Sequence, residues 1–442
     1  MLLPSAMSDL MTQLEDSQGI LGSLLTNRYN AFFRSRLNEW QLKLTTVQER
    51  IELWLQVQSL WVYLEAVFSG GDIAAQMPQE SKRFQNIDKT WEKIMVAARD
   101  TRKVIQFCYA EEMLKNLLGP LQESLDICQK SLSGYLENKR GIFPRFFFVS
   151  DAQLLEILGQ GSNPHTIQPH LSSIFDAIAE VEFSKVQRTE ILAMMSKEGE
   201  YCRLSEIVKA EGNIEDWLNK LKAEMVRTVK NICREMSTEV NSMLGKTERG
   251  DLEAFIEKYP AQVSLLGLQL WWTFESEDSL SRAKSEKGVM AAAKKKFDMI
   301  LRHLVDITTQ DLKKMHRTRV ETLITIHIHQ VDIWNEIVKK RLKSVNEFDW
   351  LKQTRFYWKV DKDDCIVSVT NCDLQYCYEY LGVAERLVIT PLTDRIYISC
   401  AQAMKMFFGG APAGPAGTGK TETTKDMGRT CGRYFITINC SD

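Results

Sequence analysis

The sequence predicts a mainly helical protein with a small β-hairpin, followed by the first part of an α/β segment. Only Pro260 lies between Pro169 and Pro391, and so few helix-breaking residues favour long helices and argue against a turn-rich all-β architecture. Apolar residues recur every three or four positions over long stretches, as on the buried face of a helix. Residues 409–419 hold five glycines and two prolines in eleven positions, which predicts a loop.

The first predicted helices cover residues 35–68, 87–109 and 121–135. The first ends at Ser69–Asp72, where two glycines stop the pattern. In the third, Pro120 is expected near the first turn, where the missing N–H of proline is tolerated. The apolar stripes are Leu37, Trp40, Leu44, Val47, Ile51 and Trp54 in the first helix, and Leu121, Leu125, Cys128, Leu132 and Tyr135 in the third.

The pattern changes period after the third helix. Residues 142–149 are short and aromatic, and they predict a strand. Ser150, with Gln153 three residues later, forms a capping box that opens a short helix. Further along, apolar residues from 214 to 236 predict an amphipathic helix of about six turns, and residues 290–342 are again helical in pattern.

A β-hairpin is predicted near residues 354–370. Residues 354–360 and 365–370 read as two strands, and the acidic stretch 361–364 between them is typical of a turn. Beyond the hairpin, Leu374, Tyr376, Tyr378 and Tyr380 alternate with other residues at period two.

The last 55 residues predict a different arrangement. A short apolar segment at 387–389 is closed by Thr390 and Pro391, and residues 394–408 read as a helix. After the glycine-rich loop, residues 420–432 read as a second helix and residues 434–439 as a strand.

Composition narrows the function classes. The 442 residues include 56 Lys and Arg against 58 Asp and Glu, so a net charge of −2 gives no global attraction to nucleic acid or an anionic membrane. No apolar run reaches the roughly 18 residues of a membrane span, and the acidic N-terminus is unlike a secretory signal. The ten cysteines form no C-x-x-C pair, which indicates free thiols in a reducing cytoplasm and no zinc site.

One motif carries chemistry. Residues 414–421 match the phosphate-binding pattern G-x-x-x-x-G-K-[ST]. Glycines let the backbone turn its N–H groups towards a phosphate, and the helix that follows aims its positive end at the same place. Lys420 supplies a cation to the β- and γ-phosphates, and Thr421 supplies a hydroxyl to Mg²⁺. A glycine-rich loop with an accidental lysine is the alternative.

Other candidates are weaker. His327 and His329 suggest a metal site, but positions two apart on a helix face different directions. Residues 294–296 are three lysines, which a solvated helix face explains. The sequence offers no Ser/His/Asp or Cys/His set with local support, so no catalytic residue is assigned.

The stretches around the loop resemble a known family. Residues 385–395, Glu-Arg-Leu-Val-Ile-Thr-Pro-Leu-Thr-Asp-Arg, and residues 409–426 resemble the start of the first AAA+ module of dynein heavy chains. Residues 129–151 and 348–382 look like the dynein linker. The resemblance runs from about Glu39 to Asp442, and it is closer to axonemal than to cytoplasmic heavy chains.

The resemblance implies three regions. Residues 39–381 would be the linker, an elongated helical-bundle arm that lies across the motor ring in this family and swings to produce the power stroke. Residues 382–442 would be the N-terminal part of the first AAA+ module, and residues 1–38 an atypical N-terminal segment. The implied cofactors are ATP and Mg²⁺.

Site residues follow from the resemblance by position. The phosphates would be held by Gly414, Pro415, Ala416, Gly417, Thr418, Gly419, Lys420 and Thr421, with Thr421 on the magnesium ion. The adenine would lie against Leu387, Val388, Ile389 and Pro391, and the backbone of Val388 or Ile389 would read its edge.

The resemblance also implies partners. The parent heavy chain would couple ATP hydrolysis to minus-end-directed movement, with its other ring modules and with intermediate and light chains, in the cytoskeleton of the ciliary axoneme. It would reach microtubules only through a stalk beyond this chain. The Walker B acids, sensors and arginine finger also lie beyond it, so hydrolysis by the chain alone is not expected.

Two other functions remain open at this point. The chain could be a non-catalytic linker or interaction protein that docks on dynein or on other axonemal components. It could also be an unrelated P-loop NTPase with a helical regulatory arm. ATP binding that depends on Lys420 would separate a formed nucleotide site from the interaction protein.

Overall fold

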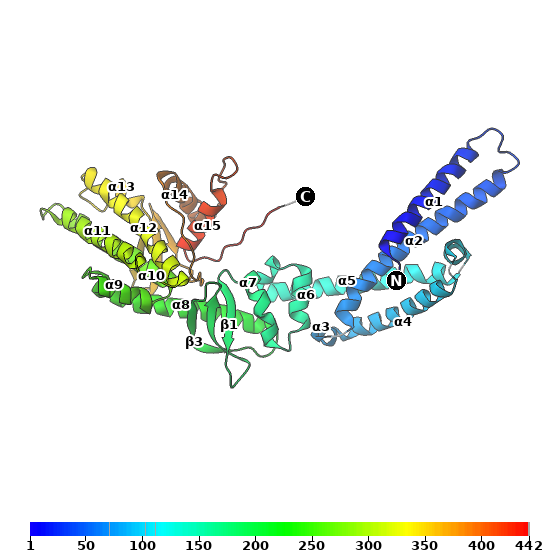
Figure 1. Cartoon of the computed structure of the whole chain (residues 1–442), viewed down its shortest axis with the longest axis horizontal. Helices are drawn as coiled ribbons and strands as arrows, with labels where there is room; N and C mark the ends of the chain where they lie inside the picture. The colour runs from blue at the N-terminus through cyan, green and yellow to red at the C-terminus, as the bar shows by residue number, and fades with distance from the viewer. Residues whose placement is uncertain (70, 102, 111, 441–442) are drawn as a thin grey trace. The chain divides into compact units, whose positions relative to one another are not determined.

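The computed structural model describes residues 1–69, 71–101, 103–110 and 112–440. By its internal contacts the chain divides into two compact units, Met1–Thr166 and Ile167–Asp442. Both are mainly helical, and within the described residues the strands form two three-stranded antiparallel sheets, both in the second unit. The predicted fold class, mainly helical with a small β-hairpin before a partial α/β segment, is confirmed (Figure 1).

The first unit consists of helices, drawn blue to cyan in Figure 1. In chain order they are α1 (Pro4–Leu25), α2 (Arg34–Phe68), α3 (Asp72–Gln76), α4 (Pro78–Thr101), the π-helix η1 (Gln106–Ala110), α5 (Glu112–Ile142), the 3₁₀ helix η2 (Pro144–Phe148), α6 (Asp151–Gly159) and the first part of η3 (Pro164–His170).

The long helix α2 confirms the prediction for residues 35–68, and its predicted stripe is buried from Leu44 to Trp54. The helix predicted at residues 87–109 begins and ends earlier in the structure, because α4 runs from Pro78 to Thr101. The predicted place of Pro120 was wrong. This proline lies inside α5, because Leu114 and Leu118 extend the buried stripe upstream.

The strand predicted at residues 142–149 is a 3₁₀ helix, so that prediction was wrong. Pro144 takes the first helical position, and Phe146 N donates to Phe143 O at 3.0 Å, closing a tight turn. Phe143 and Phe146 are fully buried, so their apolar character reflects packing and not strand pairing. The predicted helix and its cap are confirmed, because Ser150 precedes α6 and accepts a hydrogen bond from Gln153 N. The reciprocal bond of a capping box is replaced, since Gln153 Oε1 accepts from the Ser150 hydroxyl at 3.2 Å.

The second unit mixes helices with the two sheets. Its elements are the last part of η3, α7 (Leu171–Ile174), β1 (Ile178–Phe183), β2 (Glu190–Ser196), β3 (Tyr201–Lys209), α8 (Ile214–Leu244), α9 (Arg249–Lys258), α10 (Ala261–Arg282), α11 (Val289–Thr308), α12 (Lys314–Lys339), α13 (Phe348–Leu351), β4 (Arg355–Lys359), β5 (Asp364–Val369), β6 (Cys372–Gln375), α14 (Pro391–Lys405) and α15 (Lys420–Thr430).

The sequence analysis missed the first sheet, β1–β2–β3. Its strands pair in antiparallel order, with Val181 opposite Met194 and Met194 opposite Cys202. Register shifts interrupt both ladders, so the alternation of apolar and polar residues that identifies a strand is broken. A low proline content does not distinguish helices from antiparallel strands. The proline-poor region between Pro169 and Pro391 contains both.

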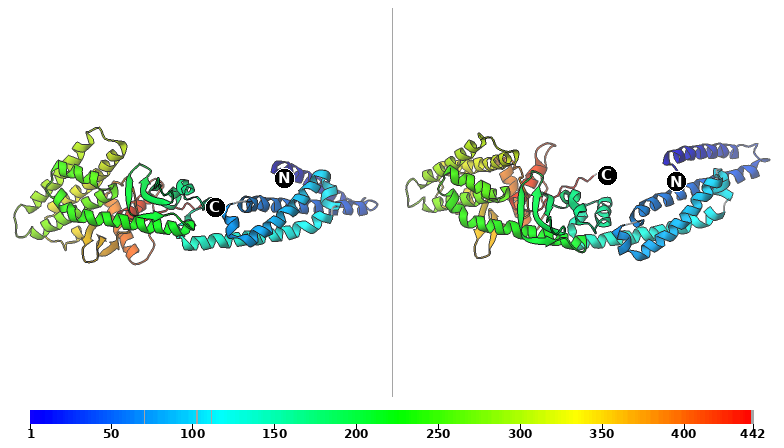
Figure 2. Two further views of the ribbon diagram at one scale, coloured as in Figure 1. Left: turned by 90° about the horizontal axis from the view of Figure 1, so that it is seen from below. Right: turned by 60° about the horizontal axis from the view of Figure 1, so that its bottom comes forward.

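Four long helices make the core of this unit. Figure 2 shows the green helix α8 running along the unit from the first sheet towards the yellow-green helices. Residues 261–273 of α10 are all buried, because α8, α11, α12 and β4 surround this helix. Trp271 of α10 packs edge-on against Phe297 of α11, with ring centroids 5.6 Å apart. The helical pattern predicted over residues 290–342 is two helices, α11 and α12.

The predicted hairpin is confirmed as β4 and β5, with Phe356 opposite Val367. A third strand, β6, follows β5. Both β5 and β6 pack against α14, and β4 packs against α10. After β6 the chain runs without regular structure through residues 376–390, and Tyr376, Tyr378 and Tyr380 are all buried there.

The C-terminal helices α14 and α15 confirm the predictions for residues 394–408 and 420–432, except that α14 starts earlier, at Pro391. The strand predicted at 434–439 was wrong, because this segment has no strand beside it among the described residues and a single strand is not stable alone. Within the part of the chain that is described, no helix is long and apolar enough to cross a membrane.

Candidate functional site

The glycine-rich loop folds into a turn in front of α15. Gly417 and Gly419 have φ of +78° and +77°, in the left-handed region that residues with a side chain rarely adopt. Gly419 is the N-cap residue of α15, and no side chain caps this helix. The N–H groups of the first turn of α15 are therefore available to an anion, which the helix dipole also favours.

The Lys420 side chain folds back over this loop. Its Nζ donates hydrogen bonds to the carbonyl oxygens of Gly414, at 2.8 Å, and of Pro415. It also lies 3.4 Å from the hydroxyl of Thr418, which donates to Pro415 O at 2.9 Å. The cation therefore lies against the loop backbone, where a phosphate oxygen would compete for it.

Three threonines begin α15, and they differ in what their hydroxyls bind. Thr423 donates to Gly419 O at 2.8 Å, and Thr424 donates to Lys420 O at 3.0 Å. Thr421 is exposed, and its hydroxyl has no hydrogen bond to any other described residue. A free hydroxyl oxygen next to a phosphate site is a ligand that Mg²⁺ accepts, so the donor set fits this ion.

The segment expected beside adenine lies against α15 at one point. Leu387 N donates to Asp426 Oδ1 at 3.3 Å, and Leu387 shares a pocket of about 710 Å³ with Glu422 and Asp426 of α15. Val388 is 69% exposed, and Pro391, also exposed, begins α14. No hydrogen bond among the described residues joins residues 388–391 to residues 414–421, so the structure joins these two predicted parts only through α15.

A buried carboxylate that the sequence analysis missed makes this connection. Arg386 donates to Asp426 through Nε at 2.6 Å and through Nη2 at 3.1 Å, and Nη2 also binds Thr430 Oγ1 at 2.6 Å. The Tyr397 hydroxyl of α14 donates to the second oxygen of Asp426. Asp426 thus ties the loop before α14, α14 itself and the helix of the phosphate motif to one another.

The charge on Asp426 depends on its partners. Burial raises the pKa of this carboxyl, but the Arg386 guanidinium and the hydrogen bonds outweigh burial and hold the pKa below its usual value. Burial lowers the pKa of Arg386, but the Asp426 carboxylate outweighs burial and holds this pKa above its usual value. Both groups are therefore charged at neutral pH.

A weak signal for this residue was present in the sequence. The buried positions of α15 are Thr423, Asp426, Met427 and Thr430, which follow helical spacing. An inward face with three polar residues out of four indicates a buried polar partner. That partner, Arg386, lies 40 residues earlier in the chain, so spacing alone does not identify it.

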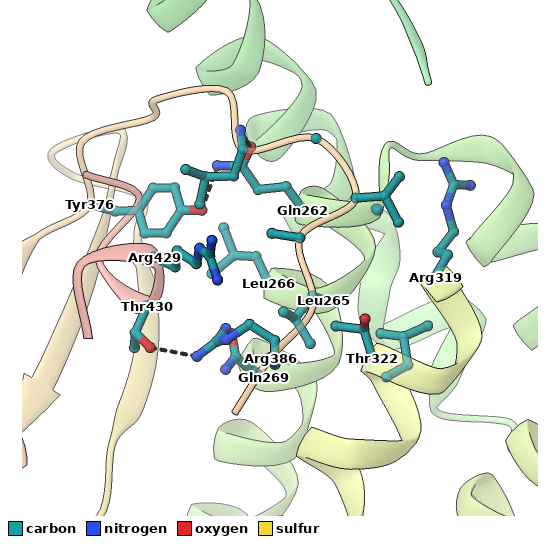
Figure 3. A pocket seen from close by; sticks show the side chains of 16 residues that line it. Gln262, Leu265, Leu266, Gln269, Arg319, Thr322, Tyr376, Arg386, Arg429 and Thr430 are labelled. Carbon is teal, nitrogen blue, oxygen red and sulfur yellow. Dashed lines mark hydrogen bonds between the residues drawn. The ribbon is translucent and has the colours of Figure 1, made fainter. Parts of the chain in front are cut away.

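A small cavity of about 30 Å³ lies between α10, α12, α15 and residues 376–386 (Figure 3). Gln262 and Tyr376 face one another across one part of it, and Arg386 reaches Thr430 across another. These residues come from the helical core and from the segment with the phosphate motif, so the cavity marks where the two meet inside the second unit.

The two histidines of α12 do not form a joint site. His327 is fully buried, and its ring nitrogens lie 2.9 Å from Gln330 Oε1 and from Phe297 O. Burial lowers its pKa, so it is neutral. His329 instead lies 3.7 Å from Asp394 of α14. No group of His, Cys, Asp and Glu among the described residues is arranged to hold a metal ion.

The sequence matches a family model described as dynein heavy chain, N-terminal region 2, over residues 1–236, more than half of the chain. The chain belongs to the dynein heavy chain family. A second model, described as the hydrolytic ATP binding site of the dynein motor region, matches residues 376–442, so the family of this region binds nucleotide. The first match includes residues 1–38, which the resemblance had set apart.

Curated relatives agree with this family. Dynein axonemal heavy chain 8 of Homo sapiens is 52% identical over 98% of this chain, and dynein gamma chain, flagellar outer arm, of Chlamydomonas reinhardtii is 51% identical over all of it. Dynein axonemal heavy chain 5 of Rattus norvegicus is 50% identical over 98%. The chain spans about a tenth of each relative, 10%, 10% and 12% of their lengths.

Proposed function

We propose that residues 414–421 bind the phosphates of ATP with Mg²⁺, and that residues 39–381 are the linker of an axonemal dynein motor. The observation that carries the nucleotide site is the loop itself, with left-handed glycines, Lys420 folded over it and an uncapped helix behind it. In this proposal the backbone of 414–419 and the ammonium of Lys420 replace water around the phosphates.

Thr421 would hold the magnesium ion, since its hydroxyl is the free one among the three threonines at the start of α15. The ion would neutralise phosphate charge. Leu387, Val388, Ile389 and Pro391 would lie against the base, and the anchoring of Leu387 N to Asp426 supports their placement next to α15.

The role of the whole protein follows from its family and its relatives, whose names are axonemal or flagellar. We place the parent chain in the ciliary axoneme, where it would couple ATP hydrolysis to minus-end-directed movement on microtubules. It would work there together with the other ring modules and with dynein intermediate and light chains. Residues 382–442 would be the N-terminal part of its first AAA+ module.

Calorimetric titration of the chain with MgATP tests the nucleotide site. We expect Lys420→Ala to weaken binding about 10- to 100-fold, because a hydrogen bond to a charged group contributes about 1.5–3 kcal/mol. Lys425→Ala is the matched control, since Lys425 lies on the same helix and its ion pair is with the exposed Glu422, at 2.8 Å. Equal binding by the two variants would contradict the assignment.

The magnesium ligand has its own test. Thr421→Ala should remove most of the difference between ATP affinity measured with Mg²⁺ and with a chelator. Thr424→Ala should keep that difference, because the Thr424 hydroxyl already binds Lys420 O. A Thr424 variant that loses as much magnesium dependence as the Thr421 variant would refute this role.

A second candidate is an interaction protein that docks on dynein or other axonemal components without binding nucleotide. It is favoured by the fact that the loop's own oxygens already occupy the Lys420 ammonium. No heat of binding at millimolar MgATP would favour this candidate over the first.

A further inference from the structure

One buried glutamine holds the segment that leads from the second sheet to α14. Gln262 lies in the first turn of α10, and its Nε2 donates to the hydroxyl of Tyr376 and to Glu379 O, both at 2.8 Å. Its Oε1 accepts from Leu381 N at 3.0 Å. Figure 3 shows the Gln262 amide directed at the Tyr376 hydroxyl. A single side chain therefore fixes residues 376–381 at three points.

The same segment holds the C-terminal end of α15. Cys377 N donates to Cys431 O at 3.0 Å, and Glu379 N donates to Gly432 O at 2.9 Å. Gly432 has φ of +58°, and a Cβ there would lie 2.6 Å from the ring of Tyr376. Tyr376 thus packs directly on the end of α15 while its hydroxyl accepts from Gln262.

The other end of α15 is the phosphate loop. The helix has 11 residues and is therefore about 16 Å long. A helix of this length moves as a rigid body, so a shift of its C-terminal end also moves the N–H groups that face the loop 414–419. Among the described residues, the hydrogen bonds of the Gln262 side chain go to residues 376–381 and not to α15 itself.

We propose that Gln262 is a positioning residue that couples α10 to the nucleotide site through Tyr376 and the end of α15. We call Gln262, Tyr376 and the two backbone bonds to Cys431 and Gly432 the clamp. Clamp closure and nucleotide occupancy stabilise each other in this scheme, since coupling between two sites is reciprocal. The proposal rests on the nucleotide site proposed above.

The clamp is tested first without nucleotide. Gln262→Met keeps the volume and removes all three hydrogen bonds, and Tyr376→Phe removes only the hydroxyl. Cys431 is buried, and burial raises the pKa of its thiol to about 11, so maleimide labels it slowly in the intact chain. We expect Gln262→Met to speed Cys431 labelling about tenfold, and Tyr376→Phe to speed it less.

Ser264→Ala is the matched control. It removes a buried hydroxyl from the same turn of α10, and this hydroxyl donates to Tyr259 O, away from residues 376–381. Labelling of Cys431 should match the unaltered chain in this variant. Equal labelling rates in the Gln262 and Ser264 variants would overturn the clamp. In the double variant, Gln262→Met with Tyr376→Phe, the change in the logarithm of the Cys431 labelling rate should be smaller than the sum of the changes in the two single variants.

The coupling is tested with MgATP. We expect Gln262→Met to weaken MgATP binding about fivefold or more, with Ser264→Ala unchanged, and MgATP to slow Cys431 labelling in the unaltered chain. An unchanged affinity in Gln262→Met overturns the coupling even where labelling is faster. If the unaltered chain binds no MgATP, the proposed nucleotide site fails, and the clamp then stands or falls on the labelling rates alone.

Discussion

The buried pair of Arg386 and Asp426 gives the sharpest test of how the segment with the phosphate loop is held. We consider Asp426→Asn, which keeps the shape of the side chain and removes its charge. Asp426 accepts from Arg386 twice, from Tyr397 and from Leu387 N, and the pair's side chains are 5% and 2% exposed. The substitution leaves the Arg386 guanidinium buried without a counter-charge.

The expected cost follows from that burial. Removing one partner of a buried ion pair costs about 3–5 kcal/mol, because the remaining charge has lost its compensation. The asparagine oxygen can still accept from Arg386 or Leu387 N, which places the expectation at the lower end, about 3 kcal/mol. The loss should appear as local opening of α14 and α15, since Asp426 joins these helices.

Native-state hydrogen exchange of α14 and α15 measures this cost, with the amides of α8 as an internal reference. Glu422→Gln is the control, because Glu422 pairs with Lys425 at 2.8 Å on the same helix but is 56% exposed. An exposed pair contributes about 0–1 kcal/mol. If Asp426→Asn opens α15 no more than Glu422→Gln does, the buried pair does not hold this segment.

Three further predictions concern separate features. The folded-state pKa of Asp426 lies below its ordinary value of 3.8, so its stabilisation is complete above about pH 4 and is lost as pH falls further; near-UV circular dichroism should show an acid transition that Asp426→Asn lacks. Ser150→Ala removes the cap of α6 at Gln153 N and should cost about 1 kcal/mol in urea unfolding. Gly267→Ala would place a Cβ 2.5 Å from the Phe255 ring and should cost about 1–3 kcal/mol, seen as a lower melting temperature.

The long helices could be predicted because their signal is local. In α8 the apolar residues recur within one turn of each other, and tertiary packing buries the same face that the period marks. The strand predicted at residues 142–149 shows the limit of this signal, because these aromatic residues lie in a tight 3₁₀ helix that begins at a proline. The first sheet was missed for a related reason, since its pairing is non-local and bulged.

The candidate site, like the fold, could be predicted from the sequence only in part. The turn of the loop at Gly417 and Gly419 could be predicted, since only glycine readily takes the left-handed conformations that the loop has there. The roles of Asp426 and Gln262 could not be predicted, because each is a single polar residue on a helix and its partners lie 29 to 119 residues away. The sequence predicts which residues bind a phosphate, and it does not show what holds them in place.

The contact between α10, α12 and the C-terminal helices is held by buried polar groups as well as by apolar packing. Gln262 bonds α10 to residues 376–381, and Glu200 accepts from Arg319 of α12, from Ala261 N of α10 and from the Tyr380 hydroxyl at 2.6, 2.7 and 2.8 Å. The Arg386–Asp426 pair then joins the end of this segment to α15. Apolar packing has little directional preference, whereas these hydrogen bonds fix one arrangement, and leaving a buried partner unsatisfied costs about 1–3 kcal/mol. We therefore expect α14 and α15 to move with α10 as one body, so that a change beginning at the phosphate loop reaches α10 and is not absorbed between them.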